Sequence, residues 1–152
     1  MKRLYVLTCI ALFLFCLSGC SNNWSTIKNN NAAFSEAVKA INADTVTLNE
    51  LTAFEWDTMY TFAPFTPKKA IEEVIGFSSS DIQATINESQ SQLIFVKDNK
   101  VVCSIYGYGN SLGYWFSFRD YLSDYLAVTP DDIVIFSVDY SGVELFLSYI
   151  QE

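Results

Sequence analysis

The chain has 152 residues, of which 51% are hydrophobic and 16% aromatic, and it carries 17 acidic against 9 basic side chains. It contains no histidine, which excludes the commonest general base, histidine-based catalytic triads and most zinc sites. Its negative charge disfavours nucleic acid as a partner, and because the sequence has no Gly-rich phosphate loop or paired-cysteine motif, no cofactor is expected.

The first 20 residues have the parts of a bacterial secretory signal. Lys2 and Arg3 form a short positive region, and residues 4–17 form an uncharged apolar run. This run is shorter than the roughly 20 residues that span a bilayer as a helix. It ends in the sequence Leu17-Ser18-Gly19-Cys20. Two alternatives stay open, an ordinary secreted protein that is cut nearby and an uncleaved anchor helix.

These four residues resemble the lipobox of bacterial lipoproteins. The resemblance implies that the signal is cut between Gly19 and Cys20, and that a diacylglycerol is attached to the sulfur of Cys20. Two or three acyl chains hold a small domain on a membrane almost permanently. Because Ser21 and not Asp follows the cysteine, the resemblance implies the outer membrane in a Gram-negative cell. In a Gram-positive cell it implies the outer face of the plasma membrane.

The chain that remains after cleavage is long enough for one domain. Loss of Lys2 and Arg3 with the signal leaves 7 basic and 17 acidic side chains, a formal charge of −10. Residues 20–33 are rich in asparagine and predict a flexible spacer after the lipidated cysteine, and residues 34–152 predict the globular domain. Cys103 has no second free cysteine to pair with, so the core and not a disulfide must supply the stability.

The first half of the domain predicts a helix, two strands and a second helix. Helical spacing of apolar residues favours a helix over residues 33–43, and a short alternation favours a strand over residues 45–48. Residues 54–62 predict a strand whose aromatic face packs inward and whose other face, with Met59 and Thr61, is wetter. A helix then opens at Thr66-Pro67 and ends at Gly76.

The second half predicts a polar loop, two hairpins and one more helix. Residues 77–92 favour the loop, and residues 93–96 and 101–108 pair around a tight Asp98-Asn99 turn. Residues 115–126 have apolar side chains at helical spacing, and residues 133–138 and 143–150 predict a C-terminal hairpin. This order predicts a single small α+β domain with a mainly antiparallel sheet and two to three helices packed on one face.

The body of the chain also resembles a known group. The sequence Phe54-Glu55-Trp56-Asp57-Thr58-Met59-Tyr60-Thr61-Phe62, followed by Pro64-Phe65-Thr66 and a helix closed by Gly76, is similar to a stretch that recurs in small bacterial lipoproteins. The similarity would extend through the hairpin that ends at Tyr108. That group implies a location and a size but no activity, so no functional residue is carried over from it.

Few residues suggest chemistry. Cys103 shares a strand face with apolar residues and has no histidine to activate it, which favours a buried hydrophobe over a nucleophile. Glu55 and Asp57 point the same way from the predicted strand, and Asp131 and Asp132 lie near a turn. A calcium site or an acid pair is conceivable there, but a solvated face is the favoured interpretation, and no metal site is expected.

Together these features predict a lipid-anchored, non-enzymatic lipoprotein of the cell envelope that binds a protein or supports an assembly. The predicted partner surface is the Gly-rich loop 107–114, with Tyr108, Asn110 and Tyr114, although its aromatic residues are at least as compatible with a core. One alternative is an acidic inhibitor or immunity lipoprotein directed at a basic hydrolase. Another is an enzyme that uses carboxylates, which needs a deep pocket joining Asp57 to a second acid.

Overall fold

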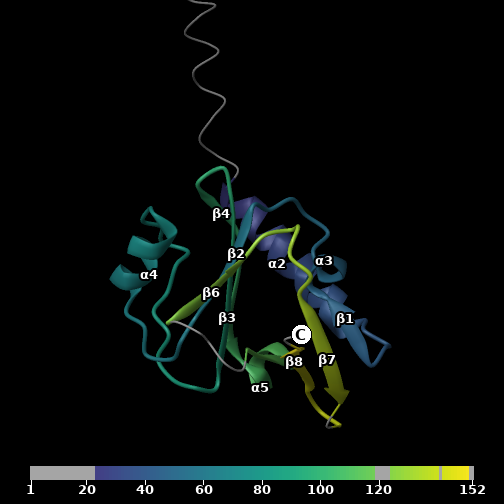
Figure 1. The fold of residues 1–152 in the computed structure, drawn as a ribbon. Helices are drawn as coiled ribbons and strands as arrows, with labels where there is room; N and C mark the ends of the chain where they lie inside the picture. Colours follow the sequence, from purple (N-terminus) through teal and green to yellow (C-terminus); the bar gives the residue numbers. More distant parts are fainter. Residues whose placement is uncertain (1–22, 119–123, 141, 151–152) are drawn as a thin grey trace, which may run out of the picture.

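The computed structural model describes residues 23–118, 124–140 and 142–150 (Figure 1). Their helices are α2 (Asn23–Lys39), α3 (Leu48–Leu51), α4 (Lys68–Ile75) and α5 (Gly109–Leu112). Their strands are β1 (Thr45–Thr47), β2 (Thr58–Phe62), β3 (Gln90–Lys97), β4 (Lys100–Tyr108), β5 (Tyr114–Ser117), β6 (Tyr125–Val128), β7 (Ile135–Tyr140) and β8 (Leu145–Ile150). The predicted α+β class with mainly antiparallel pairing is confirmed. The predicted signal sequence and lipobox lie outside the described residues.

The strands form two sheets, with the orders β1-β7-β8-β5 and β4-β3-β2-β6. Every described pairing is antiparallel except that between β5 and β8, which is parallel. The larger core cluster joins the two sheets and is rich in aromatic rings, among them Phe34, Phe95, Phe116 and Phe136. Several of these rings meet edge to face or tilted, with centroids 5.1–5.8 Å apart, the geometry that aromatic pairs prefer.

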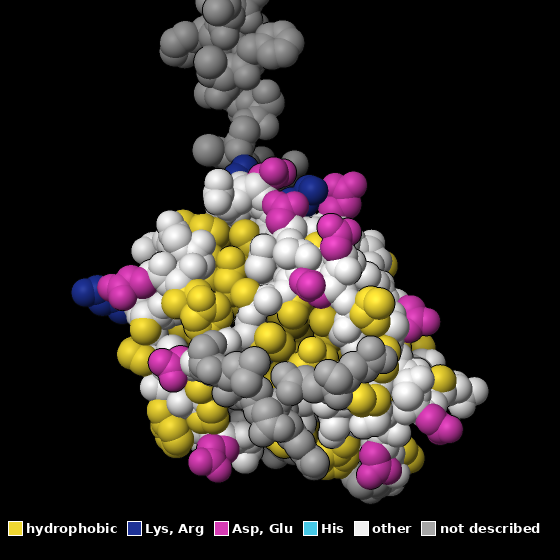
Figure 2. Space-filling view, in the orientation of Figure 1, with side chains coloured by type: hydrophobic (Ala, Val, Ile, Leu, Met, Phe, Trp, Pro, Cys, Tyr) yellow, Lys and Arg dark blue, Asp and Glu magenta, His cyan; other side chains and the backbone are white. Residues whose placement is uncertain are grey.

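A second core cluster lies on the other face of the sheet that contains β3. Ile71 and Ile75 of α4 pack there against Ile94 and Val96. Strand β3 is therefore buried on both faces from Ser91 to Val96. On the face of the molecule drawn in Figure 2, acidic side chains are spread widely, and basic side chains lie at the upper and left edges.

The predicted strand over residues 54–62 begins later than expected, at Thr58. Its aromatic residues do not form one inward face, because Trp56 lies before the strand in the larger core cluster, whereas Phe62 is buried in the second cluster. The other face is not wet, since Met59 and Thr61 are buried as well. The reason is that β2 lies between β3 and β6 in a sheet with apolar material on both sides.

The second predicted helix and both hairpins are confirmed. Helix α4 ends at Gly76, whose φ of +92° is the left-handed conformation that glycine adopts most easily. Asp98 and Asn99 have φ values of +48° and +56° and close the turn between β3 and β4. Thr66 does not cap α4 as expected, because its hydroxyl donates to the carbonyl oxygen of Ala63 at 2.7 Å.

The helix predicted over residues 115–126 is wrong. Residues 114–117 form β5 and residues 125–128 form β6, and residues 119–123 lie outside the described part of the chain. The helical spacing of the apolar residues is coincidental, because Tyr114, Phe116 and Phe118 are buried with the period of two that a strand requires. The aromatic character of this segment favours strands.

The predicted spacer is also wrong for residues 23–33, which belong to α2. Ile27 of this segment is buried in the second cluster. The amide of Asn31 donates to the carbonyl oxygen of Ser104 at 2.9 Å and accepts from its backbone N–H at 2.8 Å. Asn30 donates to the carbonyl oxygen of Val102 at 2.9 Å. Two of the asparagines that suggested a spacer therefore bind the outer edge of β4.

Replacement of Asn31 by alanine tests this contact. Asn31→Ala removes both hydrogen bonds to Ser104 and is expected to lower the free energy of unfolding by about 1–3 kcal/mol. Asn29→Ala is the matched control, since Asn29 is exposed on the same helix and is expected to change stability by no more than about 0.5 kcal/mol. Urea denaturation of the chain from Ser21 onward measures both. Equal stabilities of the two variants would contradict the proposed role of Asn31.

Candidate functional site

The carboxylates singled out in the sequence have structural partners. Lys97 Nζ lies 3.2 Å from Glu55 Oε2 and 3.8 Å from Asp57 Oδ1, and this pairing raises the pKa of Lys97. Asp57 also accepts a hydrogen bond of 2.8 Å from the backbone N–H of Asp98. These contacts explain why Glu55 and Asp57 lie together. Among the described residues, no group of three potential metal ligands is found.

The second acidic pair stabilises a turn. Asp132 accepts hydrogen bonds from the backbone N–H and the hydroxyl of Thr129 at 2.6 and 2.9 Å, and these bonds lower its pKa. Asp131 is exposed beside it. Asp132 therefore acts within the loop before β7, and neither acid lines the pockets considered below.

Cys103 lies in the larger core cluster with no exposed surface. Burial raises the pKa of its thiol well above the ordinary value, so the neutral form dominates at physiological pH. This agrees with the interpretation of Cys103 as a small buried hydrophobe.

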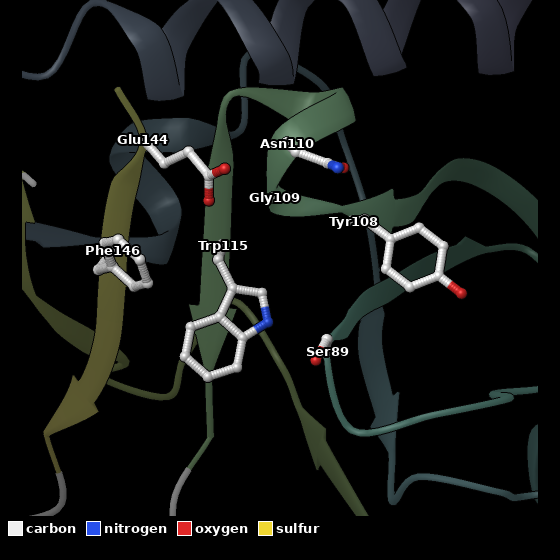
Figure 3. A pocket seen from close by; sticks show the side chains of 7 residues that line it. All are labelled: Ser89, Tyr108, Gly109, Asn110, Trp115, Glu144 and Phe146. Carbon is white, nitrogen blue, oxygen red and sulfur yellow. The ribbon is translucent and has the colours of Figure 1, made fainter. Parts of the chain in front are cut away.

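The structure divides the three residues of the predicted partner surface. Tyr114 is fully buried, and its hydroxyl shares a hydrogen bond of 2.8 Å with that of Ser35. It is therefore part of the core, and its assignment to a partner surface is wrong. Tyr108 and Asn110 instead line an open pocket of about 390 Å³ (Figure 3).

We call this cavity the Trp115 pocket. Its lining residues are Ser89, Tyr108, Gly109, Asn110, Trp115, Glu144 and Phe146. Helix α5 positions Gly109 and Asn110 of this lining, and Gly113 ends this single helical turn with a φ of +84°. Strands β5 and β8 supply the opposite part, because their parallel register places Trp115 beside Phe146. The two rings meet edge to face with centroids 5.9 Å apart.

Glu144 supplies the carboxylate of the pocket and lies close to the backbone of α5. A methyl group added at Gly109 would meet this carboxylate, so the present position of the Glu144 side chain depends on the absence of a side chain at Gly109. In Figure 3 the carboxylate, the indole of Trp115 and the ring of Phe146 lie around the same hollow. A carboxylate beside aromatic rings is suited to a cation, through charge pairing and cation–π attraction.

Trp115 adds an unused hydrogen-bond donor. Its Nε1 atom is buried and has no partner among the described residues, and in Figure 3 this edge of the indole faces Ser89. An indole N–H only donates. Because this N–H is buried, it is not accessible to a ligand in the open pocket, and the pocket offers Glu144 and the two aromatic rings as its recognition groups.

A smaller pocket of about 180 Å³ adjoins the first, and Trp115 lines both. Gln92 lines this second pocket, and its Nε2 donates to the carbonyl oxygen of Gln83 at 2.7 Å. The opposite Oε1 atom is buried without a partner among the residues described here.

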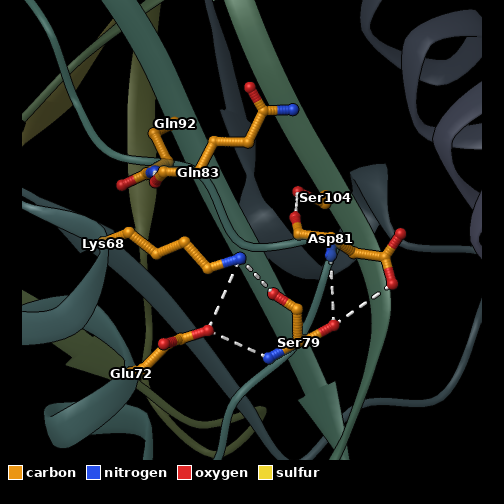
Figure 4. A network of polar contacts seen from close by, with 7 residues as sticks. All are labelled: Lys68, Glu72, Ser79, Asp81, Gln83, Gln92 and Ser104. Atoms are coloured by element: carbon orange, nitrogen blue, oxygen red, sulfur yellow. Dashed lines mark hydrogen bonds and ion pairs between the residues drawn. The ribbon is translucent and has the colours of Figure 1, made fainter.

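The segment before β3, predicted as a polar loop, is fixed by side-chain contacts (Figure 4). Lys68 of α4 donates to the carbonyl oxygen of Ser79 at 2.6 Å, and Glu72 accepts from the backbone N–H of Ser79 at 3.1 Å. Ser104 of β4 donates to the carbonyl oxygen of Asp81 at 3.0 Å. This support extends to the Trp115 pocket, where Asn87 donates to the hydroxyl of Tyr108 at 2.8 Å.

Sequence reasoning found Tyr108 and Asn110 from their place between glycines, but it missed the rest of the pocket. Trp115 was assigned to a helix, and Phe146 was assigned only to a strand. Glu144 carries no local signal, because the pairing of β8 with the distant strand β5 brings it to the pocket, and Ser89 reaches the pocket through the β3–β4 hairpin, which pairs Gln90 with Tyr108.

Comparisons with family models, with curated proteins and with solved structures each gave no match. Within the described part of the chain, no helix is both long enough and apolar enough to cross a membrane.

The buried thiol gives a chemical prediction. In the chain from Ser21 onward Cys103 is the single cysteine, and its reaction with a disulfide reagent such as DTNB is expected to be at least about 100-fold slower than in urea. Folding raises the pKa of this thiol by burying it. The stability that the neutral thiol contributes is therefore complete below its unfolded pKa of about 8.5, and it is lost as the pH rises above that value. A rapid native reaction at pH 7 would contradict this burial.

Proposed function

We propose that this chain is a lipid-anchored lipoprotein of a bacterial cell envelope that acts by binding, without catalysis. The positive start, the apolar run and the Leu17-Ser18-Gly19-Cys20 sequence support the anchor, because they occur in the order that a lipoprotein signal requires. The Trp115 pocket supports the binding role. Glu144 is the one carboxylate among its lining residues, which suits recognition better than paired acid–base chemistry.

The single observation that carries the binding role is a carboxylate held beside two aromatic rings in an open pocket. The expected occupant is a basic side chain of a protein partner, with its charge near Glu144 and its stem against Trp115 and Phe146. The formal charge of −10 after signal removal attracts such a basic partner over a longer range.

The same observation also favours the second candidate, an acidic inhibitor or immunity lipoprotein against a basic hydrolase. In that case the partner's basic side chain would belong to the hydrolase, and the complex would be stoichiometric. Its association would slow steeply with salt, because steering by charge is screened at high ionic strength. An assembly partner held mainly by contacts inside the pocket would show a weaker salt dependence.

A charge-neutral substitution in the pocket tests the binding role. Glu144→Gln keeps the shape of the side chain and removes its charge, so capture of a partner from envelope extract by the chain from Ser21 onward is expected to fall about tenfold or more. Asp131→Asn is the matched control, because it removes one exposed acid outside the pocket and is expected to retain the partner. Equal capture by both variants would refute the role of the Trp115 pocket.

Replacement of the lipidated cysteine tests the anchor. Cys20→Ala removes the acceptor of the diacylglycerol, so the variant is expected to accumulate uncleaved or away from its membrane. Membrane fractionation with mass measurement of the N-terminus checks this. Normal fractionation and normal processing of the variant would refute the lipid anchor.

A further inference from the structure

We propose that the first turns of α2 rest on the membrane surface, with Trp24 in the headgroup region and Lys28 at the lipid phosphates, so that the Trp115 pocket faces away from the membrane. This inference rests on the proposed lipid at Cys20. It goes further in assigning a membrane-contact surface and an orientation to the domain.

The length of the tether is the first argument. Only Ser21 and Asn22 separate Cys20 from Asn23, where α2 begins. Even a fully extended chain covers only about 10 Å over that interval. The backbone at the start of α2 therefore cannot lie more than about 10 Å from the backbone of the lipidated residue, whereas the spacer expected from the sequence would have allowed the domain to stand well clear of the surface.

The side chains at this end are the second argument. Trp24 is 72% exposed and belongs to neither core cluster, and Lys28 Nζ lies 5.5 Å from the centre of its ring. Tryptophan prefers the interface between headgroups and water. A lysine beside it can bury its stem and keep its ammonium group at the phosphates.

Charge is the third argument. The first acid of α2 is Glu36, so the turns nearest Cys20 carry Lys28 and no carboxylate of their own. The groove beside Trp24 does contain Asp81, whose carboxylate accepts a hydrogen bond of 3.2 Å from the hydroxyl of Ser79. The start of α2 itself therefore adds no repulsion toward anionic headgroups, although other elements bring both carboxylates and basic side chains to the same end of the domain (Figure 2).

The rigidity of α2 sets the orientation. Asn30 and Asn31 are bonded to β4, and Phe34 and Val38 lie in the larger core cluster, so the helix moves with the domain. Seventeen residues of helix span about 25 Å. The C-terminal end of α2 lies next to α5, which lines the Trp115 pocket, because the Lys39 side chain is near Gly113 at the end of α5. Figure 1 accordingly shows the start of α2 and α5 toward opposite ends of the domain.

Quenching of tryptophan emission by brominated lipid tests the proposal. The mature lipidated chain is reconstituted in vesicles of dibrominated phosphatidylcholine and, as reference, of ordinary phosphatidylcholine. Trp24 is one of 3 tryptophans, Trp56 is buried, and Trp115 lies at the other end, so a loss of about a third of the emission is expected. Trp24→Phe is expected to abolish this loss.

A longer tether is the matched control. Insertion of ten Gly and Ser residues after Asn22 leaves Cys20, Ser21 and the folded domain unchanged and adds about 15–20 Å of average reach. It is expected to reduce the quenching by at least half.

The outcomes separate the two proposals. An N-terminus whose mass shows an unmodified Cys20 overturns both the anchor and the orientation. A lipidated chain that is quenched no more than Trp24→Phe overturns the orientation alone. Quenching that persists undiminished in the long-tether variant shows that the tether does not place Trp24, and also overturns it.

Discussion

The hydrogen bonds between Asn31 and the backbone of Ser104 are the contact on which the arrangement of the domain depends. Strand β4 is an edge strand, and its outward N–H and C=O groups need partners or solvent. The Asn31 amide supplies both a donor and an acceptor, as a neighbouring strand would, and Asn30 supplies a further donor to Val102. Because these contacts fix α2 along β4, Phe34 of the same helix reaches Phe95 and Phe116 and joins the two sheets. A segment that is polar in composition thus organises an aromatic core.

The position of β3 makes that core possible. Its residues Ser91 to Val96 are buried on both faces, so this one strand contributes side chains to the larger core cluster and to the second core cluster. Ser91 illustrates the close fit, since its buried hydroxyl accepts from the backbone N–H of Phe116 at 3.0 Å and links β3 to β5 of the other sheet. The same link places Trp115, the residue before Phe116, at the border of both pockets.

The features that the sequence predicted correctly are those that depend on residues close together in the chain. The Asp98-Asn99 turn, the glycine that ends α4 and the C-terminal hairpin depend on neighbouring residues, and all three are found. The α+β class followed from their order. The predictions failed where contacts between residues far apart in the sequence determine the structure. The asparagine-rich segment is helical because its side chains hydrogen-bond to β4, and residues 114–117 form a strand because they pair with β8. Within the site, glycine spacing indicated Tyr108 and Asn110, but it could not reveal Glu144 or Phe146, which a parallel pairing brings from more than 30 residues away.

That parallel pairing also explains why the pocket is open. The alternation of β5 commits Tyr114 and Phe116 to the core, so Trp115 must point outward. Register with β8 then places Phe146 beside it, and the hydrogen bond from the backbone N–H of Leu145 to the carbonyl oxygen of Gly113 holds Glu144 over α5. Two aromatic rings and a carboxylate are thereby kept at the surface by the same register that fills the core. A substitution that shifted β5 by one residue would bury Trp115 and expose Phe116, so the core and the pocket cannot change independently.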